Sequence, residues 1–552
     1  MRAKNMTKSI SIARLLMAPT LALFLTAAAH AAAPGISGGT GTTATFYLTA
    51  QTAFLNQPDG NAVYAWGYGC ATGYSLTFVP AAITTATCST MQVPGPTMVV
   101  TEGQTVTITL QNGLPTPAGN TSILFPGFVV KATGGVQGLL TQEAAPAGTV
   151  TYTFVANSPG THAYYSGTQG DLQVEMGLYG AVIVLPATIP ADCSAGLPLT
   201  NPGGNGKAKL HWGDPDFRLA SAAFDNAKTC YDREYLFQWS EMQSSIHDAA
   251  LAQVTALVGC TAGAPGCSLN VPTEPYHPNY FLINGRSMPD LMDANYATEY
   301  PHQPYNGDPH MHPGEMTLIR TIGQGRWQHP FHEHANHVRI LARDGNLQLA
   351  PDGTDLAGLL MFNTDTTPGE SFDGIFYFTG RGLNWDPYGH HPNDTSDPLA
   401  SLGCTPDANG YNTGAPTAVN YFEWCQDHNK PLEVSPFGDV ASGGPATLPD
   451  PNIFTNGAWY GGTPYLGPDA TLRGGGTQAC VSSTGSTAAN GSSPCSTLQP
   501  SNIQANPASE RGWAYMWHSH NEREITTNNV FPGGMLMMML VDSREFVIDE
   551  TN

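Results

Sequence analysis

The chain has 552 residues, of which 43 are acidic and 21 basic, so its formal charge is −22. Nucleic acids and anionic membranes need a basic face on their partner, and this charge balance therefore argues against both. A content of 61 glycines and 44 prolines favours short strands and long loops, and the length favours more than one hydrophobic core. The composition therefore predicts an all-β protein.

The first 31 residues have the pattern of a secretory signal peptide. An apolar run over residues 15–29 follows four basic residues, and Ala29-His30-Ala31 supplies the small residues that a signal peptidase reads. A membrane anchor is the alternative, but the apolar run is short for a span. We expect a secreted or periplasmic protein without a membrane span. Its charge after cleavage would be near −26, because 17 basic residues remain against 43 acidic ones.

Ten cysteines suit such an oxidising compartment. A metal–thiolate site would need closely spaced pairs of the C-x-x-C type, and the sequence has none. The sequence alone does not fix which cysteines pair. We expect disulfides between neighbours in the sequence, namely Cys70/Cys88, Cys193/Cys230, Cys260/Cys267, Cys404/Cys425 and Cys480/Cys495.

Short alternating apolar runs in the first part of the chain predict strands. They lie at residues 97–100, 105–110, 149–155 and 181–185. A second β-rich block has such runs at residues 235–239, 280–283, 316–322, 337–342, 371–378 and 535–541, with one helix predicted at 244–258. Residues 381–508 are rich in Gly, Pro, Ser, Thr and Asn, and a loop of this length is normally functional or a decorated surface.

Two histidine pairs carry the most specific chemical signal. His332 and His334 are two residues apart, as are His518 and His520, and each pair has aromatic neighbours. Side chains two apart share one face of a strand, so adjacent strands can bring the four imidazoles together. Imidazole suits copper, zinc, iron or nickel. A pair of this kind can also be a hydrogen-bonded surface feature, but two pairs favour a metal site.

Several segments resemble the multicopper oxidase family. His329-Pro-Phe-His-Glu-His334 resembles the family signature H-P-F-H-x-H, and Trp517-His-Ser-His520 with Phe531-Pro-Gly-Gly-Met535 resembles the C-terminal signature H-C-H…G-M. Residues 94–108 resemble the opening of the family's first domain. The resemblance covers most of residues 90–380 and 510–541.

This resemblance implies cupredoxin-like domains, each a Greek-key β-sandwich. The favoured number of such domains is two. The first would comprise residues 40–187, and a linker would follow at 188–230. The second would comprise residues 231–380 plus 509–545 and would hold the metal site. The loop-rich, disulfide-containing segment 381–508 would interrupt this second domain.

The chain departs from the family pattern at the copper ligands. The family's mononuclear copper is held by a Cys thiolate and two His, often with a Met. His329 matches one of these ligands and Met535 the axial one, but Ser519 and Glu524 replace the Cys and the second His. Because a hydroxyl is not a soft ligand, no blue copper site is expected.

Only half of the family's eight trinuclear ligands remain, namely His332, His334, His518 and His520. The first-domain motifs H-W-H-G and Y-H-S-H read Leu124-Phe-Pro-Gly127 and Tyr164-Tyr-Ser-Gly167. We therefore expect one metal ion instead of three, with His329 as a further candidate ligand.

Other polar residues are assigned lesser roles. Glu522 and Glu524 are the candidate catalytic residues, placed to orient an imidazole or carry a proton. We expect His162 to be structural, and His310 and His312 to lie in a solvated loop.

Two functions from different classes remain open. The first is a secreted multicopper-oxidase-like protein that binds copper and oxidises a small molecule or metal ion with oxygen. The second is a non-catalytic cupredoxin scaffold, or a structural metal-binding protein, in which zinc could replace copper. The substrate and the oligomeric state are not predicted.

Overall fold

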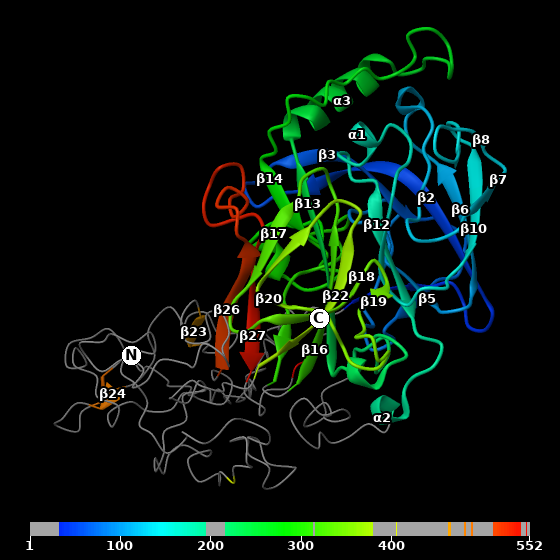
Figure 1. Cartoon of the computed structure of the whole chain (residues 1–552). Helices are drawn as coiled ribbons and strands as arrows, with labels where there is room; N and C mark the ends of the chain where they lie inside the picture. Colours follow the sequence, from blue (N-terminus) through cyan, green and yellow to red (C-terminus); the bar gives the residue numbers. More distant parts are fainter. Residues whose placement is uncertain are drawn as a thin grey trace, which may run out of the picture.

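The computed structural model describes residues 33–194, 216–312, 315–378, 405, 462–464, 480–481, 487–488, 512–542 and 548. The predicted signal peptide and nearly all of the predicted insertion lie outside these residues. The described chain is built mainly of β-strands, which form two sandwiches (Figure 1).

The first sandwich has two five-stranded sheets around one core. Alternation of buried and exposed residues defines its strands: Val150, Tyr152 and Phe154 face the core from one of them, and the threonines between them face outward. One sheet has the order β11 (Gly160–Tyr165), β12 (Tyr179–Leu185), β5 (Met98–Thr101), β1 (Gly35–Ser37) and β4 (Thr77–Val79). The other has the order β3 (Ala62–Cys70), β2 (Thr43–Asn56), β6 (Thr105–Asn112), β10 (Thr149–Val155) and β7 (Lys131–Thr133).

The second sandwich packs its sheets around a core of aromatic and methionine side chains, including Trp239, Phe331, Trp517 and Met537. One sheet comprises β14 (Tyr280–Ile283), β13 (Arg233–Met242), β16 (Met316–Gly323), β22 (Ser371–Tyr377), β18 (Val338–Arg343), β19 (Asn346–Leu347) and β20 (Leu360–Met361). The other comprises β15 (His310–Met311), β27 (Leu536–Asp542), β26 (Gly512–Ser519), β17 (His329–Glu333), β21 (Asn363–Thr366) and β23 (Gly462–Pro464).

Both sandwiches repeat one strand topology. In the first, β2 pairs parallel to β6, which pairs antiparallel to β10. In the second, β13, β16 and β22 make the same pairings. Likewise, the parallel and antiparallel pairings of β5, β12 and β11 recur in β15, β27 and β26. The predicted all-β, cupredoxin-like architecture is confirmed, whereas the domain boundaries stay a prediction.

Three strand pairs and several short helices complete the described chain. The pairs are small hairpins and edge additions: β8 (Val136–Gln137) with β9 (Gln142–Glu143), β24 (Cys480–Val481) with β25 (Thr487–Ala488), and β23 on β26. The short helices are α1 (Gly170–Gln173), α2 (Ala191–Ser194), η1 (Thr116–Ala118), η2 (Ala227–Thr229) and η3 (Asp290–Met292).

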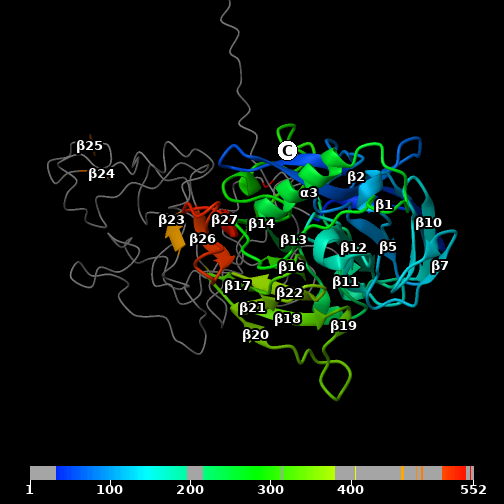
Figure 2. The same ribbon diagram turned by 90° about the horizontal axis from the view of Figure 1, so that it is seen from above.

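The predicted helix is confirmed as α3 (Ser244–Ala256), which lies over the first sandwich although it follows β13 of the second (Figure 2). Ile246 and Ala250 join the core of the first sandwich. His247 Nδ1 donates a hydrogen bond to the carbonyl oxygen of Tyr64 at 2.5 Å. Among the described residues, no helix is long and apolar enough to cross a membrane.

Three of the five predicted disulfides are confirmed, namely Cys70–Cys88, Cys193–Cys230 and Cys260–Cys267. The other two predicted pairs involve cysteines outside the described residues.

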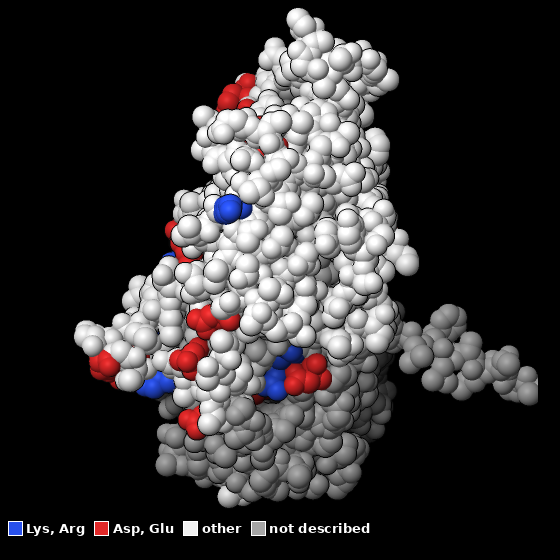
Figure 3. Space-filling view, turned by 90° about the vertical axis from the view of Figure 1, so that its right-hand side faces the viewer, with Lys and Arg blue, Asp and Glu red and all other residues white. Residues whose placement is uncertain are grey.

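Charged side chains are sparse on the face of the molecule shown in Figure 3, in keeping with a chain that is only 12% charged.

A buried ion-pair network joins the two sandwiches. Asp373 of β22 accepts hydrogen bonds from the backbone nitrogen and the hydroxyl of Thr161 in β11, at 3.1 and 2.6 Å. Arg320 of β16 donates to Asp373 at 3.1 Å and to Glu234 at 2.9 Å. Arg320 and Asp373 are fully buried. One carboxylate thus fixes the orientation of β11 relative to β16 and β22.

Removing this carboxylate should destabilise the protein strongly. Asp373→Leu leaves Arg320 with one carboxylate partner and Thr161 with none at this position, and breaking a buried pair in this way costs about 3–5 kcal/mol. A lower thermal midpoint in circular dichroism measures the loss. The control is Asp365→Leu, which replaces an exposed acid of β21. Equal midpoints for the two variants would contradict the assigned role of the network.

Candidate metal centre

The antiparallel pairing of β17 with β26 determines where the histidine pairs lie. Its register places His332 opposite His518, and Phe331 opposite Ser519. The second histidine of each pair lies just beyond its strand, where the backbone nitrogen of His334 donates to Met516 and that of His520 to Pro330. The local pattern therefore sets the pairs at strand ends, and the register brings them together.

The four imidazoles form one cluster. The ring of His332 lies 4.8 Å from that of His334, 5.3 Å from that of His518 and 4.7 Å from that of His520. Ligand atoms of His332, His334 and His518 all lie within 4.8 Å of one another. The Nε2 atoms of His334 and His518 are 3.3 Å apart. Three histidines thus form the tight set, and His520 flanks it.

The protonation of these rings suits a metal ion. Burial and, to a smaller extent, charge repulsion from the neighbouring histidines lower the pKa of His332 to about 3. Burial also lowers the pKa of His518. Neutral imidazoles keep a lone pair for a metal. His518 Nδ1 donates to the carbonyl oxygen of Ser519 at 2.7 Å, which leaves Nε2 facing the cluster.

Exposure increases across the cluster. His332 is buried, His334 and His518 are half-buried, and His520 is exposed. Behind the cluster, the rings of Phe331 and Trp517 pack 5.9 Å apart in the core, and the indole nitrogen of Trp517 donates to the carbonyl oxygen of His334. The site is therefore rigid on its inner side and accessible on the side of His520.

His329 does not join this cluster. Its Nε2 lies 2.9 Å from Glu241 and its Nδ1 2.9 Å from Glu524, and all three side chains are fully buried. Burial alone would lower the pKa of His329, but the hydrogen bonds and charges of the two carboxylates outweigh it and raise the pKa to about 9. An imidazolium with both nitrogens donating offers a metal no lone pair. This arrangement departs from the expected ligand role of His329.

Glu524 connects His329 to the loop that follows β26. It accepts hydrogen bonds from Ser519 Oγ at 2.5 Å and from Asn521 Nδ2 at 2.8 Å, in addition to its contact with His329. The position that the resemblance assigns to a mononuclear copper thus contains a protonated imidazole, a hydroxyl and a carboxylate. This set does not fit a blue copper ion. Glu522 is exposed on the turn after His520.

Two further sequence expectations can be compared with the structure. His310 and His312 are buried, so the expectation of a solvated loop is wrong. The reason is that β15 pairs with β27, which places His310 Nδ1 2.5 Å from Asp542, and Asp308 is 3.3 Å from Nε2. Asp542 is 232 residues away along the chain, so no local pattern signals this contact. His162 is structural as expected, since its Nε2 donates to the carbonyl oxygen of Ser158.

The charged His329 should make stability depend on pH. Its pKa is about 9 in the folded protein and about 6.5 when unfolded, so its contribution is complete below pH 6.5 and is lost as the pH rises through 9. The pKa difference corresponds to about 3 kcal/mol. In His329→Gln this part of the pH dependence should be absent, as measured by thermal melts between pH 6 and 9.5.

The control for this measurement is His277→Gln, which changes an exposed histidine. Wild type and control should lose stability over the same pH range, and the gap between wild type and His329→Gln should narrow as the pH rises. A gap that stays constant across the range would show that His329 is not charged in the folded protein.

Part of the sequence is similar to a known protein family, and the fold is similar to solved structures. The multicopper oxidase family model matches residues 77–188. Among solved structures, the multicopper oxidase mgLAC is 14% identical, with a TM-score of 0.40, over 92% of this chain and 87% of its own. The blue copper oxidase from Nitrosomonas europaea is also 14% identical, with a TM-score of 0.40, over 90% and 85%. No curated protein matches the sequence.

The match to the family model covers the strands β4 to β12 of the first sandwich. It includes the segments around Leu124 and Tyr165, where the sequence resemblance would place histidines of the first domain. Residues 77–188 are therefore similar to a multicopper oxidase domain, which confirms the resemblance predicted from the sequence.

Proposed function

We propose that the protein binds one copper ion through His332, His334 and His518, with His520 as a fourth ligand, and oxidises a small reductant with dioxygen. The observation that supports this most is the convergence of three imidazole ligand atoms within 4.8 Å of one another. Such a set, drawn from two strands and held by their register, supports a metal site.

Copper is the metal that the donor set and the family favour together. Imidazole nitrogens bind copper well, and the similarity of residues 77–188 to a multicopper oxidase domain favours copper. A bound copper ion would supply one-electron exchange with a reductant. Zinc was the alternative, and it would leave no redox role for the site.

The chain's own residues prepare the site for such an ion. The lowered pKa of His332 keeps its imidazole neutral over the physiological pH range, so a metal does not compete with a proton there. The hydrogen bond from His518 Nδ1 to Ser519 fixes the ring and its tautomer. Because His520 is exposed, a small reductant and dioxygen can approach from that side.

The proposed stoichiometry is one copper ion per chain, bound by four histidines. Reduction of dioxygen to hydrogen peroxide takes two electrons and two protons, and successive reductant molecules would supply the electrons. The substrate class would be small molecules or metal ions, without nucleic acid. The signal-peptide pattern and the disulfides, such as Cys70–Cys88, support a secreted or periplasmic location for this chemistry.

A specific observation also supports the second function, a copper-binding protein without turnover. His329, Ser519 and Glu524 form an ion-pair and hydrogen-bond network where the family resemblance expects the copper that takes electrons from the substrate. Without that centre, electrons would have to reach the histidine cluster directly. Oxygen consumption distinguishes the two functions.

Replacing two ligands from different strands should abolish copper binding. The full chain should bind about one copper ion, and His334→Ala with His520→Ala should reduce this to near zero, because only two imidazoles remain. Metal analysis together with electron paramagnetic resonance measures the change. His277→Ala, which removes an exposed histidine elsewhere, is the control. Unchanged copper content in the double variant would place the metal at other residues.

Copper-loaded protein should consume oxygen in the presence of a suitable reductant. The screen would cover phenols and low-valent metal ions, and both the copper-free protein and the double variant should be inactive. The copper-loaded protein should also lack the intense blue absorption of a copper–thiolate bond, since Ser519 has no thiol. Bound copper without oxygen consumption across the screen would favour the scaffold function.

A further inference from the structure

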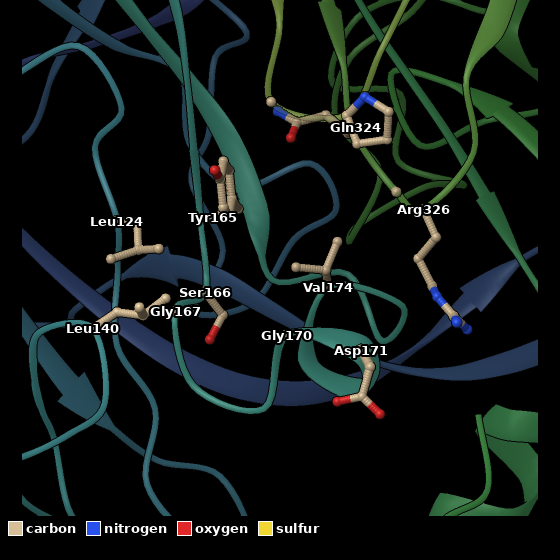
Figure 4. A pocket seen from close by; sticks show the side chains of 13 residues that line it. Leu124, Leu140, Tyr165, Ser166, Gly167, Gly170, Asp171, Val174, Gln324 and Arg326 are labelled. Carbon is tan, nitrogen blue, oxygen red and sulfur yellow. The ribbon is translucent and has the colours of Figure 1, made fainter. Parts of the chain in front are cut away.

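A cavity of about 480 Å³ lies between the two sandwiches (Figure 4). The first sandwich supplies Leu124, Leu140, Tyr165 and Val174 to its lining. The second supplies segments 324–326 and 368–369, which follow β16 and β21. None of the four clustered histidines lines it. Its volume is within the range of small-molecule sites.

The cavity occupies, in the first sandwich, the place that the histidine pairs occupy in the second. Strand β11 pairs antiparallel with β12, as β26 does with β27. At the end of β11, Leu124 and Tyr165 form a β-bridge. Near the end of β26, His332 and His518 are paired in the same way. The strand end that carries imidazoles in one sandwich therefore carries leucine, tyrosine and glycine in the other. This replacement turns a metal-facing surface into an apolar one.

Hydrogen bonds of the backbone hold both walls in place. The backbone nitrogen of Leu124 donates to Tyr165 at 2.8 Å, and that of Gly369 donates to Gly323 at 2.8 Å. Gly167 adds a steric constraint, because a Cβ atom there would lie 2.7 Å from Cγ of Leu124. A larger residue at position 167 would therefore require the side chain of Leu124 to move. The cavity is thus preformed.

The charged groups of the lining are engaged elsewhere. The guanidinium of Arg326 donates to the carbonyl oxygen of Thr273 and to Glu274, and it lies 4.0 Å from the ring centre of Tyr276. The carboxylate of Asp171 accepts from the hydroxyl of Thr273. These contacts hold both charges at one edge of the cavity, so the main lining is uncharged.

The rest of the lining combines aliphatic side chains with the polar residues Tyr165, Ser166 and Gln324. Ser166 Oγ donates to Gln173, and Gln324 Nε2 donates to Gly180 and Gln238, so the donors of these two residues are already engaged within the protein. Leu124, Leu140 and Val174 present aliphatic side chains, and Tyr165 presents its ring (Figure 4). Within the described part of the chain, the hydroxyl of Tyr165 makes no hydrogen bond that would occupy it. A charged ligand would lose its hydration here without gaining a partner, whereas an apolar ligand with one donor or acceptor would be satisfied.

We propose that this cavity binds an uncharged, mainly apolar small molecule that carries a single hydrogen-bonding group. The site is separate from the proposed copper centre and does not depend on it. The ligand class follows from the aliphatic walls, the engaged charges and the Tyr165 hydroxyl. A molecule of two or three rings would fill the volume.

Fluorescence of the uncharged probe N-phenyl-1-naphthylamine, titrated with the full chain, tests the proposal. The wild type should bind the probe saturably, with one site per chain. Leu140→Asp should weaken binding about tenfold or more, because it adds a carboxylate to the apolar lining. The matched control is Leu139→Asp, since Leu139 is also exposed and adjacent but does not line the cavity.

Two further variants make the test independent of the charge. Val174→Phe should weaken binding by filling the cavity, whereas Val258→Phe, at an exposed position elsewhere, should not. Tyr165→Phe should weaken binding about fivefold through the loss of one hydrogen bond. Thermal melts check the folding of each variant. Because Leu140 is largely exposed, Leu140→Asp decides the outcome even where Val174→Phe proves unstable.

Three results would overturn the proposal. The wild type could fail to bind the uncharged probe, or Leu140→Asp could bind it as tightly as Leu139→Asp does. The third is a preference for the anionic analogue 8-anilino-1-naphthalenesulfonate over the uncharged probe. None of these results depends on copper content or oxygen consumption.

Discussion

The candidate metal centre depends on the register between β17 and β26. A shift of one residue would turn each histidine to the opposite face of its strand and would bring Glu333, now fully buried, toward the cluster. The core enforces this register, because Phe331 and Trp517 lie on the buried face of the same strands. Packing of aromatic side chains thus holds the imidazoles together before any metal is present.

The duplicated topology shows how one architecture holds different chemistry at equivalent strand ends. Near the end of β26, His518 faces His332, and near the end of β11, Tyr165 pairs with Leu124. The backbone pairings are alike, so the difference lies in the side chains alone. The buried contact between Asp373 and Thr161 of β11 fixes this strand against the second sandwich.

Sequence patterns predicted several of the strands and the grouping of the histidine pairs, but not the long strands β2 and β3. Strands β10 and β14 begin and end at the expected residues because their apolar runs are clear, and α3 lies within the predicted range 244–258. The partners of His310 and His329 were not predictable. Asp542 lies 232 residues from His310, and Glu241 and Glu524 lie 88 and 195 residues from His329. Such contacts depend on sheet order, which no local pattern encodes.

His329 occupies a position that the sequence resemblance assigns to a copper ligand, but its contacts are ion pairs. Here the imidazolium of His329 supplies the positive charge, and Glu241 and Glu524 balance it from opposite sides. Ser519 and Asn521 complete the hydrogen bonding of Glu524. Because buried charges are tolerated only when paired and hydrogen-bonded, the network fills the site chemically as well as sterically. Metal binding in this chain would therefore be restricted to the histidine cluster, where the rings are neutral.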